Sequence, residues 1–176
     1  MKVMTHTSFK GLIGGLLMAA LVSIPSATEA QQRVVHSVSG SGLTVVEKDF
    51  FFPGSPAFTF RNIIAATLHA DGTVSGKLVV HVIQPPEAPI TLVGDITCLT
   101  FEGKTVFYGA TIVKSTNPGY SPVGTEAVGF VTDTDGDGPD ISWGGPSIFF
   151  LQPGQTCADH PIMPQQPINS GNFVVR

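Results

Sequence analysis

Apolar and polar residues alternate along most of the chain after residue 56. In "AFTFRNIIAATLH", one face of an extended chain would carry the apolar residues Phe58, Phe60, Ile64, Ala66 and Leu68. The other face would carry Thr59, Arg61, Thr67 and His69. A period of two is typical of a β-strand with one buried face. The pattern therefore predicts a strand between a core and solvent.

The same pattern recurs with short connections between the segments. "ADGT" follows the first strand, and Asp71-Gly72 is a hairpin turn signal. Further strands are predicted in "RVVHSVSGSGLTVV", "VSGKLVVHVI", "ITLVGDITCLTF", "TVFYGATIVKS", "TEAVGFVT", "ISWGGPSIFFL" and "NFVVR". "QPGQTCADHPIMPQQPINSG" is too rich in Pro and polar residues for a regular element. No useful length shows a helical period.

These features predict an all-β fold. Short connections favour neighbouring antiparallel strands, which is a meander. Gly94, Gly109 and Gly129 each fall near the middle of a predicted strand, where glycine permits the sharp bends of a small barrel. We therefore expect a closed up-and-down β-barrel of about eight strands. The alternative is a two-sheet β-sandwich, which needs longer crossovers.

The N-terminal 30 residues have the features of a secretory signal peptide. Lys2 and Lys10 form a positive leader before an apolar run, residues 11–24, that is too short to span a bilayer. Small residues then predict cleavage after Ala30, which leaves residues 31–176 as a single secreted or periplasmic domain. The alternative is an uncleaved anchor. After cleavage, no transmembrane segment is expected.

Composition narrows the classes of function. Removal of Lys2, Lys10 and Glu29 with the leader leaves 7 basic and 12 acidic residues, a net charge of −5. This acidic balance lacks the basic footprint that nucleic acid or anionic lipid requires. Hydrophobic residues make up 42% of the chain and charged residues 12%, which argues against disorder.

The chain has two cysteines, Cys98 and Cys157. In an oxidising compartment a disulfide between them is the expected state. It would tie the loop around Cys157 to a strand of the barrel wall. The alternative is two separate buried thiols.

The sharpest chemical motif is "DTDGDGPDIS". Asp133, Asp135, Asp137 and Gly138 match the opening of a calcium loop, in which oxygen ligands alternate. The twelfth position, where a bidentate Glu should stand, is Gly144, and strands rather than helices flank the motif. Both features argue against an EF-hand. A looser calcium site would use Asp133, Asp135, Asp137 and Asp140; the alternative is turn chemistry alone.

Signatures of catalysis are absent: the chain has no G-x-S-x-G, H-E-x-x-H, C-x-x-C or phosphate-binding glycine loop. We therefore predict no catalytic residue and no resident cofactor apart from calcium. His36, His69, His81 and His160 are expected as separate surface or hydrogen-bonded side chains rather than metal ligands. Asp95, Glu102 and Glu126 are expected as solvated acids, the alternative being a paired carboxylate site.

Aromatic residues point to binding. Phe50, Phe51 and Phe52 are consecutive, as are Phe149 and Phe150, so some of them must lie outside the barrel or in a homo-oligomer contact. Inside the barrel, the residues predicted to line a cavity for a small apolar ligand are Phe58, Phe60, Tyr108 and Trp143. The alternative is a packed core, since a barrel of about eight strands can have either.

Several stretches together resemble a group of small exported bacterial β-rich proteins without an assigned activity. They are "HADGTVSGKL", "GDITCLTFEGKTVFYGATIV", "GTEAVGFVTD", "DISW" and "SGNFVVR", which span most of residues 55–176. Members of the group often have a less acidic Gly/Asn-rich loop where this chain has "DTDGDGPD". The resemblance implies turns and strands and brings no site residue.

The sequence thus favours a non-enzymatic module that binds a small ligand or a surface. Two other hypotheses remain: a barrel enzyme of cyclase or isomerase type, and an envelope protein stabilised by calcium.

Overall fold

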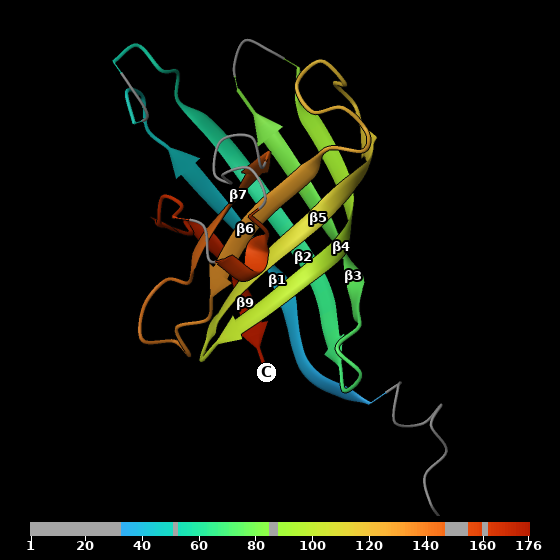
Figure 1. Ribbon diagram of the computed structural model, residues 1–176. Helices are drawn as coiled ribbons and strands as arrows, with labels where there is room; N and C mark the ends of the chain where they lie inside the picture. The colour runs from blue at the N-terminus through green and yellow to red at the C-terminus, as the bar shows by residue number, and fades with distance from the viewer. Residues whose placement is uncertain (1–32, 51–52, 85–87, 147–154, 160–161) are drawn as a thin grey trace, which may run out of the picture.

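The computed structural model describes residues 33–50, 53–84, 88–146, 155–159 and 162–176. Nine antiparallel strands form one sheet in the order β8-β7-β6-β5-β4-β3-β2-β1-β9, which curls into a half-barrel (Figure 1). The described residues contain no α-helix and no other helix that is long and apolar enough to cross a membrane. The predicted all-β antiparallel meander is therefore confirmed; the closed barrel and the sandwich stay predictions.

The strands follow the sequence pattern closely. Their bounds are β1 Val34–Val46, β2 Phe58–His69, β3 Val74–Ile83, β4 Ile90–Glu102, β5 Thr105–Ser115, β6 Glu126–Thr132, β7 Ile141–Pro146, β8 Gln166–Pro167 and β9 Ser170–Val175. The last five residues of "ISWGGPSIFFL" lie outside the described residues.

The β2–β3 hairpin shows why local sequence sets the register. Gly72 has a φ of 83° and donates its N–H to the carbonyl of His69 at 3.0 Å. Asp71 Oδ1 accepts hydrogen bonds from the hydroxyl and the N–H of Thr73, at 2.7 and 3.0 Å. These bonds, the side-chain one first, hold the pKa of Asp71 below its ordinary value. The predicted Asp71-Gly72 turn is present.

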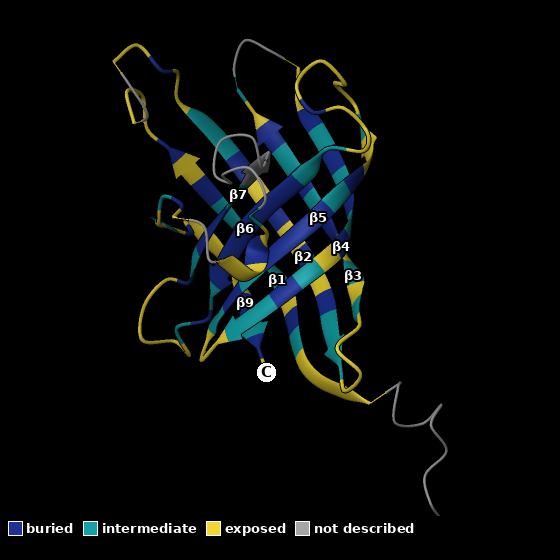
Figure 2. Ribbon diagram, viewed as in Figure 1, coloured by how far each residue is buried: buried dark blue, intermediate teal, exposed yellow. Residues whose placement is uncertain are grey.

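The core lies on the concave face of the sheet, and buried positions alternate with more exposed ones along β2 and β3 (Figure 2). Leu78, Val80 and Val82 of β3 are buried as the pattern predicts. The largest fully buried side chains include Tyr108, Phe173, Ile64, Leu78 and Ile112. One buried cluster contains these side chains together with Trp143 of β7, so strands at or next to both ends of the sheet share one core.

The packing around residue 129 of β6 explains why this residue is a glycine, in addition to the bend that was predicted there. A Cβ at this position would overlap the Tyr108 hydroxyl and the Trp143 carbonyl. A Cβ at Gly144 of β7 would overlap the same hydroxyl. The ring of Tyr108 therefore lies against a floor of two glycines, which leave room for it.

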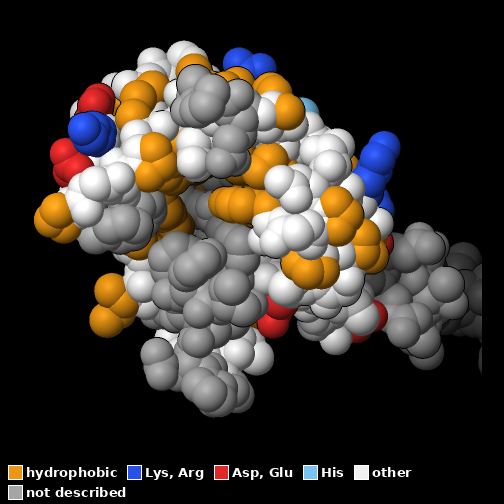
Figure 3. Space-filling view, turned by 90° about the horizontal axis from the view of Figure 1, so that it is seen from above, with side chains coloured by type: hydrophobic (Ala, Val, Ile, Leu, Met, Phe, Trp, Pro, Cys, Tyr) orange, Lys and Arg blue, Asp and Glu red, His pale blue; other side chains and the backbone are white. Residues whose placement is uncertain are grey.

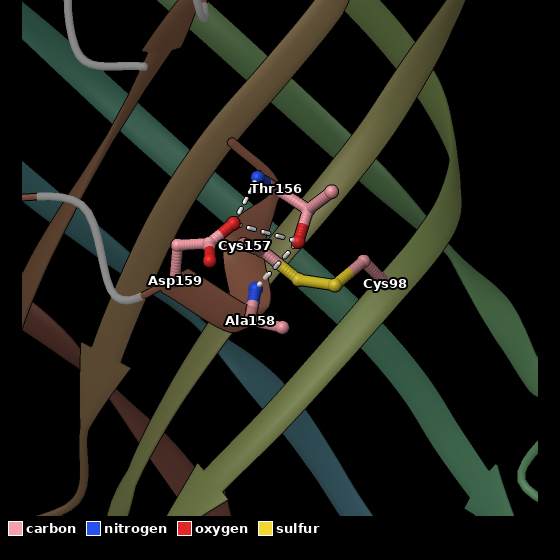
Figure 4. Close-up of a disulfide and its surroundings, with 5 residues drawn as sticks. All are labelled: Cys98, Thr156, Cys157, Ala158 and Asp159. Atoms are coloured by element: carbon pink, nitrogen blue, oxygen red, sulfur yellow. Dashed lines mark hydrogen bonds between the residues drawn. A yellow bond between two sulfur atoms is a disulfide. The ribbon is translucent and has the colours of Figure 1, made fainter. Parts of the chain in front are cut away.

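Cys98 on β4 and Cys157 form the predicted disulfide, with their Cα atoms 6.1 Å apart (Figure 4). Cys157 begins a short 3₁₀ helix, η2 (Cys157–Asp159), that packs against β4 and β5. Asp159 Oδ2 accepts the N–H of Thr156 at 2.6 Å, and Thr156 Oγ1 accepts the N–H of Ala158 at 3.2 Å. The disulfide thus fixes a capped turn on the outer face of the sheet.

The prediction that this segment has no regular element is wrong, because it contains η2 and the two-residue strand β8. Its proline content concealed the T-x-x-D spacing of Thr156 and Asp159, which resembles a capping box.

Replacing both cysteines by serine should lower the free energy of unfolding by about 4 kcal/mol, because the disulfide closes a long loop in the unfolded chain. Chemical denaturation of the variant and of the oxidised protein measures the difference. The single Cys98→Ser and Cys157→Ser variants should match the double variant. Equal midpoints for the oxidised protein and the double variant would show that the bond adds no stability.

Candidate functional site

The four residues predicted to line a cavity pack on one another. Phe60 is 2% and Trp143 3% exposed, Tyr108 is fully buried, and Phe58 is half-buried. The rings of Phe60 and Trp143 meet edge to face with centroids 5.2 Å apart, and those of Phe58 and Phe60 lie 6.1 Å apart. Aromatic pairs at these separations attract. The groove on the outer face described below is lined by none of the four.

Tyr108 is a neutral polar group inside the core. Its hydroxyl donates to the carbonyl of Trp143 over 3.5 Å, which is a long contact. Burial of the phenol raises the pKa of Tyr108 well above its ordinary value, so the hydroxyl keeps its proton at neutral pH. The group therefore has the form of a hydrogen-bond donor and not of a general base.

Among the described residues, three further polar side chains are completely buried: Thr44 of β1, Asn62 of β2 and Ser142 of β7. Within this part of the chain, Thr44 Oγ1, Ser142 Oγ and both amide atoms of Asn62 have no hydrogen-bond partner. Asn62 Nδ2 lies 3.5 Å from the position that a Cβ of Gly144 would take, so Asn62 faces β7 across the core. Each unpartnered buried group costs stability.

Asn62 was not predicted as a core residue, because the apolar residues that alternate around it were already sufficient to predict a strand. Its position between Phe60 and Ile64, on the apolar face, was the available signal.

Asn62→Leu should leave the free energy of unfolding unchanged or raise it by about 1 kcal/mol, because it removes unpartnered polar atoms at similar volume. Thermal and denaturant unfolding measure this, with Asn62→Ala as the comparison that adds a void. A loss of more than about 1 kcal/mol in the Leu variant would instead show that the amide has a bound partner, such as a buried water.

Backbone hydrogen bonds link the two ends of the sheet where the chain passes from β8 to β9, a segment we call the seam (residues 166–175). Ile168 N–H donates to the Asp140 carbonyl at 2.8 Å, and the next residue, Asn169, donates to the Leu43 carbonyl at 2.7 Å. The seam therefore bonds to the start of β7 on one side and to β1 on the other.

Two aspartates of the predicted calcium motif hold β9. Asp140 Oδ2 accepts the N–H of Phe173 at 2.6 Å, and Asp133 Oδ2 accepts the N–H of Val175 at 3.0 Å. The remaining oxygens of both carboxylates accept local N–H groups of residues 134 and 135. The carboxylates thus accept hydrogen bonds from backbone N–H groups on the edge of β9 that does not pair with β1.

The other two aspartates of the motif point elsewhere. Asp135 pairs with Lys104 at 2.9 Å, and Asp137 is exposed. Among the described residues, no group of three or more His, Cys, Asp or Glu side chains has a geometry that could hold a metal ion. The calcium prediction therefore rests on the sequence motif alone.

Acid should release the clamp on β9. The hydrogen bond from Val175 holds the pKa of Asp133 below its ordinary value of 3.8, so this carboxylate stabilises the fold above that value and loses the contribution as pH falls through the lowered pKa. Unfolding measured from about pH 6 down to about pH 2 should show a steeper loss of stability in the natural protein than in Asp133→Asn. Parallel curves would contradict this assignment.

A groove of about 380 Å³ lies on the outer face of the sheet. Its floor is formed by two cross-strand pairs of β5 and β6, Phe107 with Phe130 and Thr105 with Thr132. These positions alternate with the inward-facing Val106 and Val131, so they lie on the outer face of the sheet, where Phe130 is 5% exposed. The residues that line the groove are Glu102, Thr105, Phe107, Phe130, Thr132, Ile162, Met163 and Gln165.

The groove combines apolar walls with a polar end. The rings of Phe107 and Phe130 have centroids 6.0 Å apart and are tilted by 41°. Thr105 Oγ1 and Thr132 Oγ1 share one hydrogen bond of 2.9 Å. Met163 is buried against the sheet, while Ile162 is 97% exposed at the margin. This arrangement can hold a small apolar body and offer hydrogen bonds at one end.

The disulfide positions one wall of the groove. Residues 162–165 follow η2 in the chain, and η2 is bonded to β4 through Cys157.

Sequence reasoning named Glu102 only as a solvated acid and missed the other seven lining residues. The available signal was a phenylalanine at an outward position of each of two adjacent strands, but their pairing requires the register of β5 and β6.

The remaining candidates are dispersed. His36 stacks on Phe101 with centroids 4.9 Å apart, and His69 and His81 bond to Ser75 and Thr91 at 3.0 Å. His160 lies outside the described residues. Asp95 pairs with Lys77. Thr111 of β5 pairs with both Asp95 and Glu126 and so separates them, while Glu102 lies at the end of β4.

The β1–β2, β3–β4 and β5–β6 connections lie at one end of the half-barrel, which we call the loop end. It carries several apolar side chains, seen as orange atoms in Figure 3. Exposed hydrophobic residues in its connections and strand ends are Phe50, Ile83, Tyr120 and Val123. Phe50 also contacts Trp143, with centroids 6.3 Å apart. The other phenylalanines predicted for an oligomer contact, Phe51, Phe52, Phe149 and Phe150, lie outside the described residues.

No family model matches the chain, and the searches of curated proteins and of solved structures also found no match.

Proposed function

We propose that the protein is an exported, non-enzymatic module that binds a small ligand with an apolar body in the groove on β5 and β6. The observation that supports this is the groove itself. Its volume of about 380 Å³ falls within the range of small-molecule sites. Two phenylalanines and a methionine supply apolar contact, while threonine hydroxyls and Gln165 can orient a ligand.

Burial of the polar groups in the interior favours binding over the cyclase or isomerase hypothesis. The polar groups inside the core, Asn62, Ser142 and Tyr108, are completely buried. A substrate would need an opening to reach them, whereas the outer groove needs none. Among the described residues that line the groove, Glu102 is the only ionisable side chain, so this part of the lining offers no pair of acid and base groups.

The proposal includes a barrel that closes across the seam. Support comes from the hydrogen bonds of residues 168 and 169 to β7 and β1, and from the carboxylate clamp on β9. It also includes export, which the leader-like residues 1–30 and the disulfide favour.

Phe107→Ala should weaken binding of the neutral fluorescent probe N-phenyl-1-naphthylamine at least about tenfold, because it removes one apolar wall of the groove. Fluorescence titration of the disulfide-bonded protein measures affinity, and circular dichroism verifies folding. The matched control is Val123→Ala, an exposed apolar position at the loop end.

Equal weakening by both variants would place the probe elsewhere. An unchanged affinity in folded Phe107→Ala would contradict the groove as the binding site, whatever the natural ligand.

A further inference from the structure

One wall of the groove is tied to the sheet through the disulfide. Residues 162–165, three of which line the groove, lie in the chain between Cys157 of η2 and Gln166 of β8. Gln166 pairs with Ser142 of β7. Cys157 is bonded to Cys98 of β4. The wall is therefore anchored by backbone pairing at one end and by a covalent bond at the other.

The hydrogen bonds of Thr156, Ala158 and Asp159 join these residues to one another (Figure 4). Thr156 donates its N–H to Asp159 Oδ2 at 2.6 Å, and Asp159 donates its N–H to the Thr156 carbonyl at 3.1 Å. Ala158 donates its N–H to Thr156 Oγ1 at 3.2 Å. A helix of three residues is not stable by itself. The disulfide is thus the bond that holds this turn on β4.

The wall is apolar where it packs on the sheet. Met163 is buried and belongs to the same cluster of buried side chains as Phe130, and Phe107 packs against that cluster. Phe130 is 5% exposed although it lies on the outer face of β6, so an outer layer covers it. Met163 lines the same groove and is the buried member of the wall. The wall therefore completes the apolar part of the groove.

Burial of one methionine does not hold the wall by itself. Ordering four residues costs conformational entropy for each of them, and the apolar area of a single side chain offsets only part of that cost. A covalent anchor lowers the cost, because a tethered segment has fewer other arrangements to lose. Release of Cys157 should therefore free the wall and leave the strands of the sheet in place.

We propose that the Cys98–Cys157 disulfide is a redox switch for the groove. In the oxidised protein residues 162–165 form the wall and the ligand binds, whereas in the dithiol form the wall is released and the ligand binds weakly. This inference rests on the proposed function, because it concerns regulation of the same groove. It adds the chemical condition under which the groove is complete.

The reductant is an external dithiol. Its thiolate attacks Sγ of Cys98, which is the half-buried member of the pair, since Cys157 is completely buried. The S–S bond breaks, and Cys157 leaves as a thiolate and takes up a proton. The second thiolate of the reductant then displaces Cys98, which also takes up a proton. Two electrons pass to the protein, and the reductant becomes a disulfide.

Ligand and redox state must then affect each other by the same factor. If reduction weakens binding fivefold, a saturating ligand shifts the thiol–disulfide equilibrium about fivefold toward the disulfide. Incubation of the natural protein in dithiothreitol buffers, with and without saturating N-phenyl-1-naphthylamine, measures this shift. Alkylation of the free thiols and intact mass give the reduced fraction.

Fluorescence titration with the same probe measures binding directly. The protein reduced by excess dithiothreitol and the Cys98→Ser/Cys157→Ser variant should each bind at least about fivefold more weakly than the oxidised protein, because one apolar wall is lost. Circular dichroism verifies that both keep the sheet. The matched control is Leu78→Ala, a buried residue of β3 whose truncation also lowers stability but leaves the disulfide in place. Its affinity should equal that of the natural protein.

Met163 gives a second readout that does not depend on a ligand. It is the only methionine in residues 31–176, so one added oxygen in the mass of this part of the chain reports on it alone. Hydrogen peroxide transfers that oxygen to the thioether and becomes water. The rate should rise at least about tenfold in Cys98→Ser/Cys157→Ser, and it should stay unchanged in Leu78→Ala.

Met163→Ala keeps the disulfide but removes the apolar contact of the wall. It should weaken the probe in the oxidised protein, and reduction of this variant should weaken it little further, because both changes remove the same wall. Independent, additive losses would place the action of the disulfide elsewhere and overturn the switch.

Other outcomes also overturn it: probe affinity within twofold of the oxidised value in the folded forms that lack the disulfide, an unchanged oxidation rate of Met163, or equal losses in Leu78→Ala. Loss of the native circular dichroism signal on reduction would do the same, since the bond would then hold the whole fold. In each case the groove keeps its ligand if Phe107→Ala weakens the probe in the oxidised protein. Failure of the proposed function shows in that titration alone.

Discussion

A curled sheet ends in two edges, and the backbone donors along those edges must find acceptors. In this protein the chain meets that requirement by passing from one edge to the other in residues 166–175. The strand β9 pairs with β1, and on its other side Asp133 and Asp140 accept two of its N–H groups. Carboxylates replace a neighbouring strand there, which lets the core residues Phe173 and Val175 stay buried.

A second constraint links the core to the outer layer. Tyr108 faces inward from β5 over Gly129 and Gly144, while its neighbour Phe107 faces outward and forms the groove floor. The disulfide from β4 to η2 holds the polypeptide that becomes the groove's other wall. The position of the groove thus follows from strand alternation on one side and from a covalent bond on the other.

Local physical chemistry explains which features were predictable. The strands and the Asp71-Gly72 hairpin were predicted because they depend on residues that are neighbours in the sequence. The disulfide was predicted because the chain has only two cysteines. The T-x-x-D cap of η2 was also local, but the prolines around it concealed it. The groove was missed because Phe107 and Phe130 are 23 positions apart in the sequence, and only the register of β5 and β6 pairs them.

The sequence by itself determined an all-β meander with one disulfide. The alternation of apolar residues and the turn residues act over short distances along the chain, and two cysteines can form only one pair. Tertiary structure decided the roles of individual side chains. Asp133 and Asp140 resemble ion ligands in the linear motif, yet they bind β9, 42 and 33 residues later. Asn62 looks like one polar residue in an apolar strand, yet it lies at the centre of the core. A side chain's partners depend on which strands the fold brings beside it, and alternation alone does not specify them.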